Sequence, residues 1–164
     1  MRAVSSTRVG DGASTSISEP DPSTVAVGIA IFAAIQLGLA LFMAVAPHAF
    51  YTAVGPFGVF NGHYIRDVAS FYGAIGIGLL LSLSRPSWRV PMLAVTTIQY
   101  ALHSVNHLLD IDKAHPLWNG YFDFFSLAAA TVLLAWMWRA AAREATPSAV
   151  APQRRSTVVS ERRS

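Results

Sequence analysis

Four long apolar stretches alternate with short polar ones along the chain, and each has about the length of a membrane-crossing helix. They cover residues 25–46, 67–83, 90–109 and 118–138. The first stretch holds 22 residues without a charge. At about 1.5 Å per residue, such a helix reaches roughly 33 Å, enough to cross a bilayer core of about 30 Å. The pattern predicts an all-α integral membrane protein, folded as a four-helix bundle.

The two ends of the chain have a different pattern. Residues 1–24 and 141–164 are rich in small and polar residues and lack apolar periodicity. Such segments cannot bury enough apolar surface to fold, so we expect disordered tails around one domain at residues 25–140. A cleaved signal peptide is the alternative for the first stretch, since A-V-A at 44–46 resembles a cleavage site. The stretch exceeds the usual run of about 7–15 apolar residues and Pro47 follows it, which favours a span.

The segment between the first two stretches, residues 47–66, interleaves aromatic residues with glycine, proline and asparagine. Aromatic side chains favour the membrane–water interface, while glycine and proline interrupt helices. The segment is therefore expected to form an interfacial loop or a short re-entrant piece. The second helix is expected to begin at Asp67, because an acid is favourable at a helix N-terminus.

Composition agrees with a membrane protein. Hydrophobic residues make up 53% of the chain and charged residues 13%, where a soluble domain carries roughly a quarter charged residues. The chain has no cysteine, which excludes disulfides and thiolate metal ligands. Its net charge of +3 is explained by arginines near the predicted helix ends and in the tails. We therefore expect no nucleic-acid partner.

Basic residues are distributed unequally between the two sides that four spans would create. The side facing outward has only Arg66 and Lys113. Because basic residues collect on the cytoplasmic side, both tails are expected in the cytoplasm. The side with the tails carries Arg2, Arg8, Arg85, Arg89, Arg139, Arg143, Arg154, Arg155, Arg162 and Arg163.

Small residues recur every fourth position in the first two apolar stretches. This spacing puts them on one helix face, where they let two helices approach closely in lipid. We expect these faces to be the packing faces. The residues are Ala26, Ala30, Ala34 and Gly38 in the first stretch and Ser70, Ala74, Gly78 and Ser82 in the second.

Most ionisable groups at membrane depth lie where the second stretch begins, the third ends and the fourth begins. With four spans, these positions all fall at the outer face. Embedded polar groups are costly in hydrocarbon and mark a functional site by default. The sequence therefore predicts one outward-facing polar pocket. Its candidate residues are His63, Arg66, Asp67, His103, Asn106, His107, Asp110, Asn119 and Asp123.

A pair of histidines is the sharpest chemical signal in this pocket. His103 and His107 are four residues apart and share one helix face. Two imidazoles at that separation can ligate a metal, with Asp123, or alternatively Asp67 or Asp110, as an oxygen ligand. The spacing alone is a weak signal. Two interfacial histidines hydrogen-bonded to carbonyls or water are the alternative.

A stripe of polar residues follows the third stretch at Gln99, His103, Asn106 and Asp110. The fourth stretch carries a second stripe of Asn119, Asp123 and Ser126. Two such stripes facing each other predict either a small wet cavity or hydrogen bonds between helices. Arg66, if it faces a ligand, suits a carboxylate or a quinone-like group. Gln36 stands alone in the first stretch and is expected to donate a hydrogen bond to a neighbouring helix.

Two motifs carry a family resemblance. The segment F-N-G-H-Y-I-R-D-V-A-S-F-Y-G opens the second stretch, and H-S-V-N-H-L-L-D ends the third. Together with four short spans over about residues 24–140, they resemble the DoxX-like proteins and related small bacterial membrane proteins. The resemblance implies a four-helix membrane bundle and supplies no catalytic residues. Some DoxX-type proteins are associated with quinone-linked oxidoreductase complexes.

Three functions remain open on the sequence. The leading one is an accessory or binding subunit with an outward-facing His/Asp pocket. The second is a membrane redox or metal-dependent enzyme, or a subunit of one, using His103 and His107 with a metal or a quinone. The third is a structural partner protein. The expected partners are the bilayer and either another membrane subunit or further copies of the chain.

Overall fold

The computed structural model describes residues 22–146, and every regular element within them is a helix. The expected tails, apart from residues 22–24 and 141–146, lie outside the described residues. The helices are α1 (Pro22–Val45), α2 (Pro47–Ala53), α3 (Gly62–Ser84), the 3₁₀ turn η1 (Pro86–Trp88), α4 (Arg89–Leu109) and α5 (Leu117–Ala145).

Several helix boundaries differ from the expected ones, and local chemistry explains each. α3 begins at Gly62 because the Asn61 side chain accepts hydrogen bonds from the amides of His63 and Tyr64, each 3.1 Å long. Asp67 is therefore inside α3, which corrects its placement at the helix start. Part of the expected 47–66 loop is helix α2, opened by Pro47.

The last helix is also longer than expected. The apolar pattern ends at residue 138, yet α5 continues to Ala145. Four alanines lie in this extension, and alanine has the highest helix propensity. Ala140 and Ala141 are also buried in the core cluster, so packing and helix propensity together extend α5 past the last strongly apolar residues.

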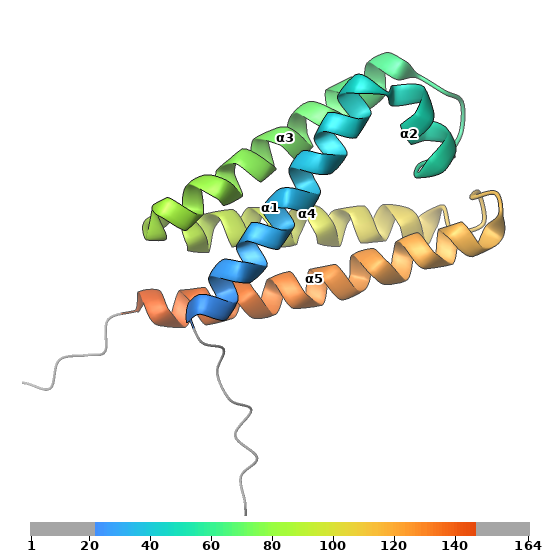
Figure 1. Ribbon diagram of the computed structural model, residues 1–164. Coiled ribbons are helices and arrows are strands. Elements are labelled where there is room, and N and C mark those ends of the chain that lie inside the picture. Colours follow the sequence, from blue (N-terminus) through green and yellow to red (C-terminus); the bar gives the residue numbers. More distant parts are fainter. Residues whose placement is uncertain (1–21, 147–164) are drawn as a thin grey trace, which may run out of the picture.

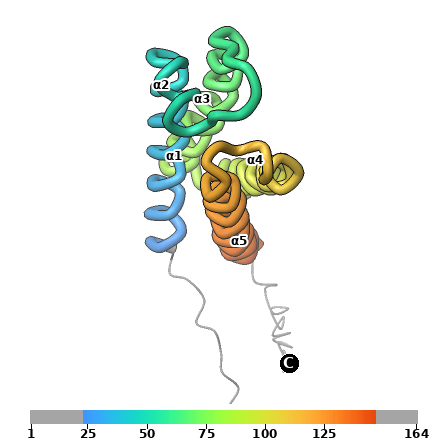
Figure 2. Tube along the Cα trace, turned by 90° about the vertical axis from the view of Figure 1, so that its right-hand side faces the viewer, coloured from blue at the N-terminus to red at the C-terminus, as the bar shows by residue number. Residues whose placement is uncertain are grey.

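The long helices form two antiparallel hairpins. α1 packs chiefly on α3, and α4 packs chiefly on α5. The hairpins are joined through η1, and in Figure 1 they diverge from that turn toward the end occupied by α2. Figure 2, turned by 90°, shows α4 and α5 end-on beside the upright α1 and α3. The two hairpins therefore cross.

The core lies where the hairpins meet. Ile29, Leu79, Leu93 and Leu134 belong to α1, α3, α4 and α5 respectively, and none has any exposed surface. These side chains join all four long helices in one cluster. The cluster fixes how the hairpins cross, and it thereby sets the space left between them toward the α2 end.

The small-residue spacing predicted the packing faces only in part, because Gly78 and Ser82 of α3 are buried but Ser70 and Ala74 are exposed. Ala30, Ala34 and Gly38 of α1 are exposed, and a Cβ added at Gly38 would meet no atom within 4 Å. On α3 the close approach to α1 is at Gly76, where a Cβ would lie 2.7 Å from Leu37 Cγ, and the predicted Gly78 closely approaches Met92 of α4. The expected α1 face is wrong because the larger residues of α1, among them Ile29, face the other helices instead.

Three helices of the described part are long and apolar enough to cross a membrane: α1 from Ser23, α3 and α5. α4 has 21 residues but does not reach that apolarity, because Gln99, His103, Asn106 and His107 lie in it. The chain thus has the features of a membrane protein. The place of α4 in the bilayer follows from its packing and is treated below.

Candidate functional site

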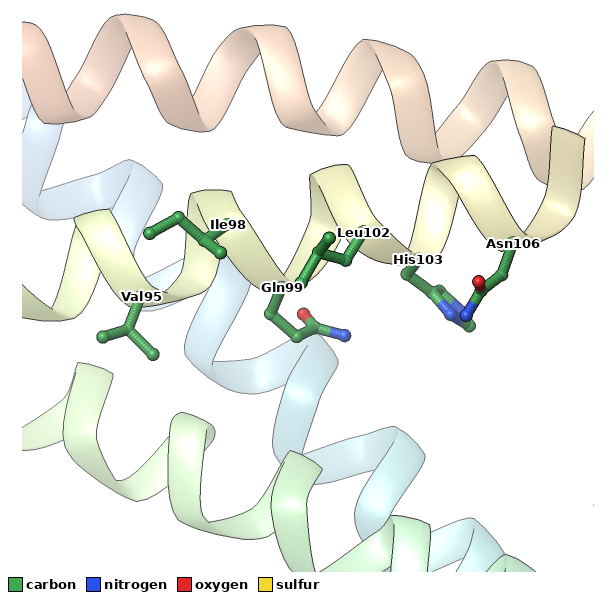
Figure 3. A pocket seen from close by; sticks show the side chains of 6 residues that line it. All are labelled: Val95, Ile98, Gln99, Leu102, His103 and Asn106. Atoms are coloured by element: carbon green, nitrogen blue, oxygen red, sulfur yellow. The ribbon is translucent and has the colours of Figure 1, made fainter.

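A groove of about 410 Å³ runs along α4. In Figure 3 its lining side chains project from α4, and Val95, Gln99 and His103 point away from α5 into the space beside α1 and α3. The lining combines an apolar part with a polar part. It consists of Val95, Ile98, Gln99, Leu102, His103 and Asn106.

The polar part of the lining contacts both helices of the other hairpin. Gln36 of α1 is fully buried, and its Nε2 donates to Gln99 Oε1 at 3.5 Å. This confirms the expected hydrogen bond from Gln36 to a neighbouring helix. The Tyr72 ring of α3 lies 6.5 Å from the His103 ring, centroid to centroid.

Beyond His103, further polar residues lead from α4 toward α5. The His103 and His107 rings meet edge to face, with centroids 4.8 Å apart. His107 Nδ1 faces Asp123 Oδ2 at 3.8 Å. Both atoms are buried, and neither has a hydrogen-bond partner among the described residues. The Phe57 ring, from the loop after α2, packs on His107 with centroids 5.1 Å apart.

Other expected pocket residues lie apart from this group. His63 and Asp67 form their own pair, with Nε2 and Oδ2 3.4 Å apart on the exposed surface of α3. Arg66 Nη1 donates to the Gly62 carbonyl of its own helix at 3.0 Å. The N-terminal end of α3 diverges from α4 (Figure 1), which explains why these three residues do not reach the histidines.

Two further candidates lie at or beside the turn between α4 and α5. Asp110 ends α4 and forms an ion pair with Lys113. The hydrogen bond and the charge of Asp110 raise the pKa of Lys113 above its ordinary value. Asn119 lies in the first turn of α5, half-buried. These groups lie beside the turn between α4 and α5 and do not line the groove.

The expected metal set is incomplete in this geometry. Within residues 22–146, no group of three or more His, Asp or Glu side chains is arranged to hold a metal ion. His103 and His107 are adjacent, and Asp123 faces only His107. The described residues therefore bring two imidazoles and one carboxylate close together without completing a metal centre.

Two groups in this region were absent from the candidate pocket. Tyr72 stands among the apolar and glycine residues of α3, and an isolated tyrosine at that depth signals a buried polar contact. Phe57 carries no such signal in the sequence. Its contact with His107 depends on the path of the loop after α2, which local patterns do not specify.

No family model, curated protein or solved structure matches this chain. The likeness to DoxX-like proteins therefore rests on the two motifs and the four apolar stretches of the sequence. Function has to be argued from the groove and its polar residues.

Proposed function

We propose that the chain is a four-span inner-membrane bundle of the DoxX-like kind that acts as a binding subunit, holding a membrane-soluble molecule in the α4 groove. The observation that supports this proposal is the composition of the groove. Val95, Ile98 and Leu102 offer an apolar surface, and Gln99 and His103 offer hydrogen-bonding groups beside it. Small-molecule sites typically combine a mostly apolar lining with a few placed polar groups.

The packing of α4 supports a fourth span. α4 lies antiparallel along α5, which is apolar enough to cross a membrane. Ser104 and Thr131 approach within 3.4 Å, oxygen to oxygen, between the two helices. A helix packed along a spanning helix shares its depth. Exposed apolar residues of α4, such as Val105 and Leu108, then face lipid tails.

The orientation follows the arginines. Both tails are cytoplasmic in this proposal, and the α4–α5 turn faces outward, as the positive-inside rule requires. Single cysteines in place of Ser87 and Asp112, both exposed and at opposite ends of α4, test it directly, because the chain has no cysteine of its own. An impermeant thiol reagent added to cells with a permeabilised outer membrane should label Asp112→Cys only. Equal labelling of the two positions would refute a spanning α4.

Filling the groove tests the function. Ile98→Trp puts an indole into the groove, whereas Val132→Trp puts one on the surface of α5, where Val132 is 70% exposed. Native mass spectra of the purified proteins should show a retained small molecule in the wild type and in Val132→Trp but not in Ile98→Trp. If Ile98→Trp retains the same molecule to the same extent, the groove is not the binding site, and a structural partner role becomes the better proposal.

An enzyme is the alternative, and the paired histidines are the observation that favours it. His107 is fixed between His103, Phe57 and Asp123, a placement that suits proton transfer to a bound ligand. A quinone is one ligand compatible with both proposals. Loss of turnover in His107→Gln with retained ligand would favour the enzyme; loss of the ligand itself would favour binding alone.

A further inference from the structure

The groove carries no charged side chain along its length. Its lining is Val95, Ile98, Gln99, Leu102, His103 and Asn106. The charged residues nearest in sequence at the two ends of α4 point elsewhere. Arg89 Nε donates to the Ser82 carbonyl at 3.4 Å, and Asp110 is paired with Lys113.

This lining discriminates between lipid head groups. A phosphate placed beside Gln99 and His103 would lose hydration without gaining a cation, and burying an unpaired charge is costly. Hydroxyl and carbonyl groups carry no such cost, because the amides of Gln99 and Asn106 can both donate and accept hydrogen bonds. The groove therefore favours an uncharged head group.

The order of residues along α4 also sets a direction. The middle of α4 is Gln99, so Val95 lies in the N-terminal half of the helix, and His103 and Asn106 lie in its C-terminal half. The stretch from Val95 to Asn106 corresponds to roughly 16 Å of helix. The apolar part of the lining thus begins before the middle of α4, and the polar part follows it toward the turn between α4 and α5.

From these features we infer that the ligand is an uncharged amphiphile with a hydroxyl- or carbonyl-bearing head at Gln99, His103 and Asn106. Its hydrocarbon chain lies along Val95 and Ile98, toward the N-terminal half of α4. The inference rests on the proposed function, since it presupposes that the groove is the binding site. It adds the chemical class of the ligand.

Two lipids that differ only in a phosphate provide the test. Dioleoylglycerol has a free hydroxyl and ester carbonyls, and dioleoyl phosphatidic acid carries a phosphate in place of that hydroxyl. The full-length protein is titrated with each lipid in detergent at pH 7.5, and the bound fraction is read by native mass spectrometry. We expect the uncharged lipid to bind at least about tenfold more tightly, because the phosphate would be desolvated without a cation.

Charge insertion sharpens the test. Leu102→Lys places an ammonium group in the groove, and it should reverse the preference toward phosphatidic acid. Gln99→Leu combined with Asn106→Leu should weaken dioleoylglycerol binding. Leu108→Lys serves as the control for charge, because Leu108 is exposed on α4 outside the groove, and it should leave the preference unchanged.

The possible results separate the two proposals. If wild type binds phosphatidic acid as well as dioleoylglycerol or better, the inference about the head group is wrong while the groove remains a lipid site. If neither lipid binds more to the wild type than to Ile98→Trp, the proposed function and this inference both fail. If Leu108→Lys shifts the preference as much as Leu102→Lys does, the discrimination does not arise in the groove.

Discussion

The α1/α3 hairpin and the α4/α5 hairpin consist of helices of similar length but contain different chemistry. Between α1 and α3 the contacts are apolar and close, as at Gly76 against Leu37. α4 instead buries Thr96, Thr97 and Ser104 and presents Gln99, His103 and Asn106 to the groove. One hairpin is built for packing, and the other supplies the polar groups of the candidate site.

This division has a physical basis. Helix pairs in lipid associate through close packing. Lipid tails are as apolar as leucine, so no hydrophobic force drives two helices together. The close packing of α1 and α3 can therefore stabilise the fold although α4 presents polar side chains on its surface. On α4 the hydroxyls of Thr96, Thr97 and Ser104 each bond a carbonyl four residues earlier. Their polarity is thus satisfied within the helix and is not needed for the groove.

The largest effect is expected from breaking the tight hairpin. Gly76→Leu inserts a side chain where even a Cβ would lie 3.2 Å from the Leu37 backbone nitrogen. Overpacking of this kind should lower the free energy of unfolding by about 3 kcal/mol. The measurement is a denaturant titration in mixed micelles.

Gly38→Leu is the matched control for this change. Gly38 is also a helix glycine, but a Cβ there meets nothing within 4 Å, so the substitution should leave the unfolding free energy close to that of the wild type. Equal destabilisation by both substitutions would mean that the α1–α3 contact is not where stability resides.

The outcome at Gly38 also illustrates what the sequence could predict. Apolar stretch lengths were sufficient to locate four long helices, because each needs a continuous apolar or amphipathic face. The small-residue rule placed Gly78 and Ser82 correctly in buried positions but failed on α1. Alanine and glycine on a lipid-facing surface obey the same spacing as on a packed one, so spacing alone cannot tell the two apart.

The candidate site shows a similar limit. Helical spacing predicted the adjacency of His103 and His107, since four residues make about one turn. The approach of Asp123 needed the antiparallel packing of α4 on α5, which short connections favour. The exclusion of Asp67 could not be predicted. It depends on the divergence of the hairpins (Figure 1), and that divergence is set by the core where all four helices meet.

A smaller effect is expected at the contact between His107 and Asp123. His107→Leu leaves the half-buried Asp123 carboxylate facing an apolar group, and we expect a loss of about 1–2 kcal/mol in unfolding free energy. The double variant His107→Leu/Asp123→Leu should recover part of that loss, because no polar group is then left facing an apolar one. Thermal or denaturant unfolding of the two variants decides the point. Additive losses would show that the two side chains act independently.

A still smaller effect is expected at the hydrogen bond between Gln36 and Gln99, which connects the two hairpins. Their amides are 3.5 Å apart, nitrogen to oxygen, a long hydrogen bond between α1 and α4. A double-mutant cycle with leucine at each position should give a coupling energy of about 0.6 kcal/mol, as is typical between membrane helices. A coupling of zero would mean that the hairpins are joined only by the apolar core. Since Gln99 also lines the groove, Gln99→Leu should additionally weaken ligand retention, whereas Gln36→Leu should not.

The smallest effect is expected at the ion pair in the turn between α4 and α5. Lys113 and Asp110 are exposed, and exposed pairs contribute little to stability. The pKa of Lys113 is raised by its hydrogen bond to Asp110 and by that carboxylate's charge. Any contribution is therefore fully present below the ordinary lysine pKa of about 10.4 and is lost only as the pH rises through the raised value. Lys113→Ala should thus leave the unfolding midpoint unchanged and equally insensitive to pH between about 6 and 9. If Lys113→Ala lowered the free energy of unfolding as much as His107→Leu does, the turn between α4 and α5 would belong to the polar site of this hairpin. The groove would then have a charged end.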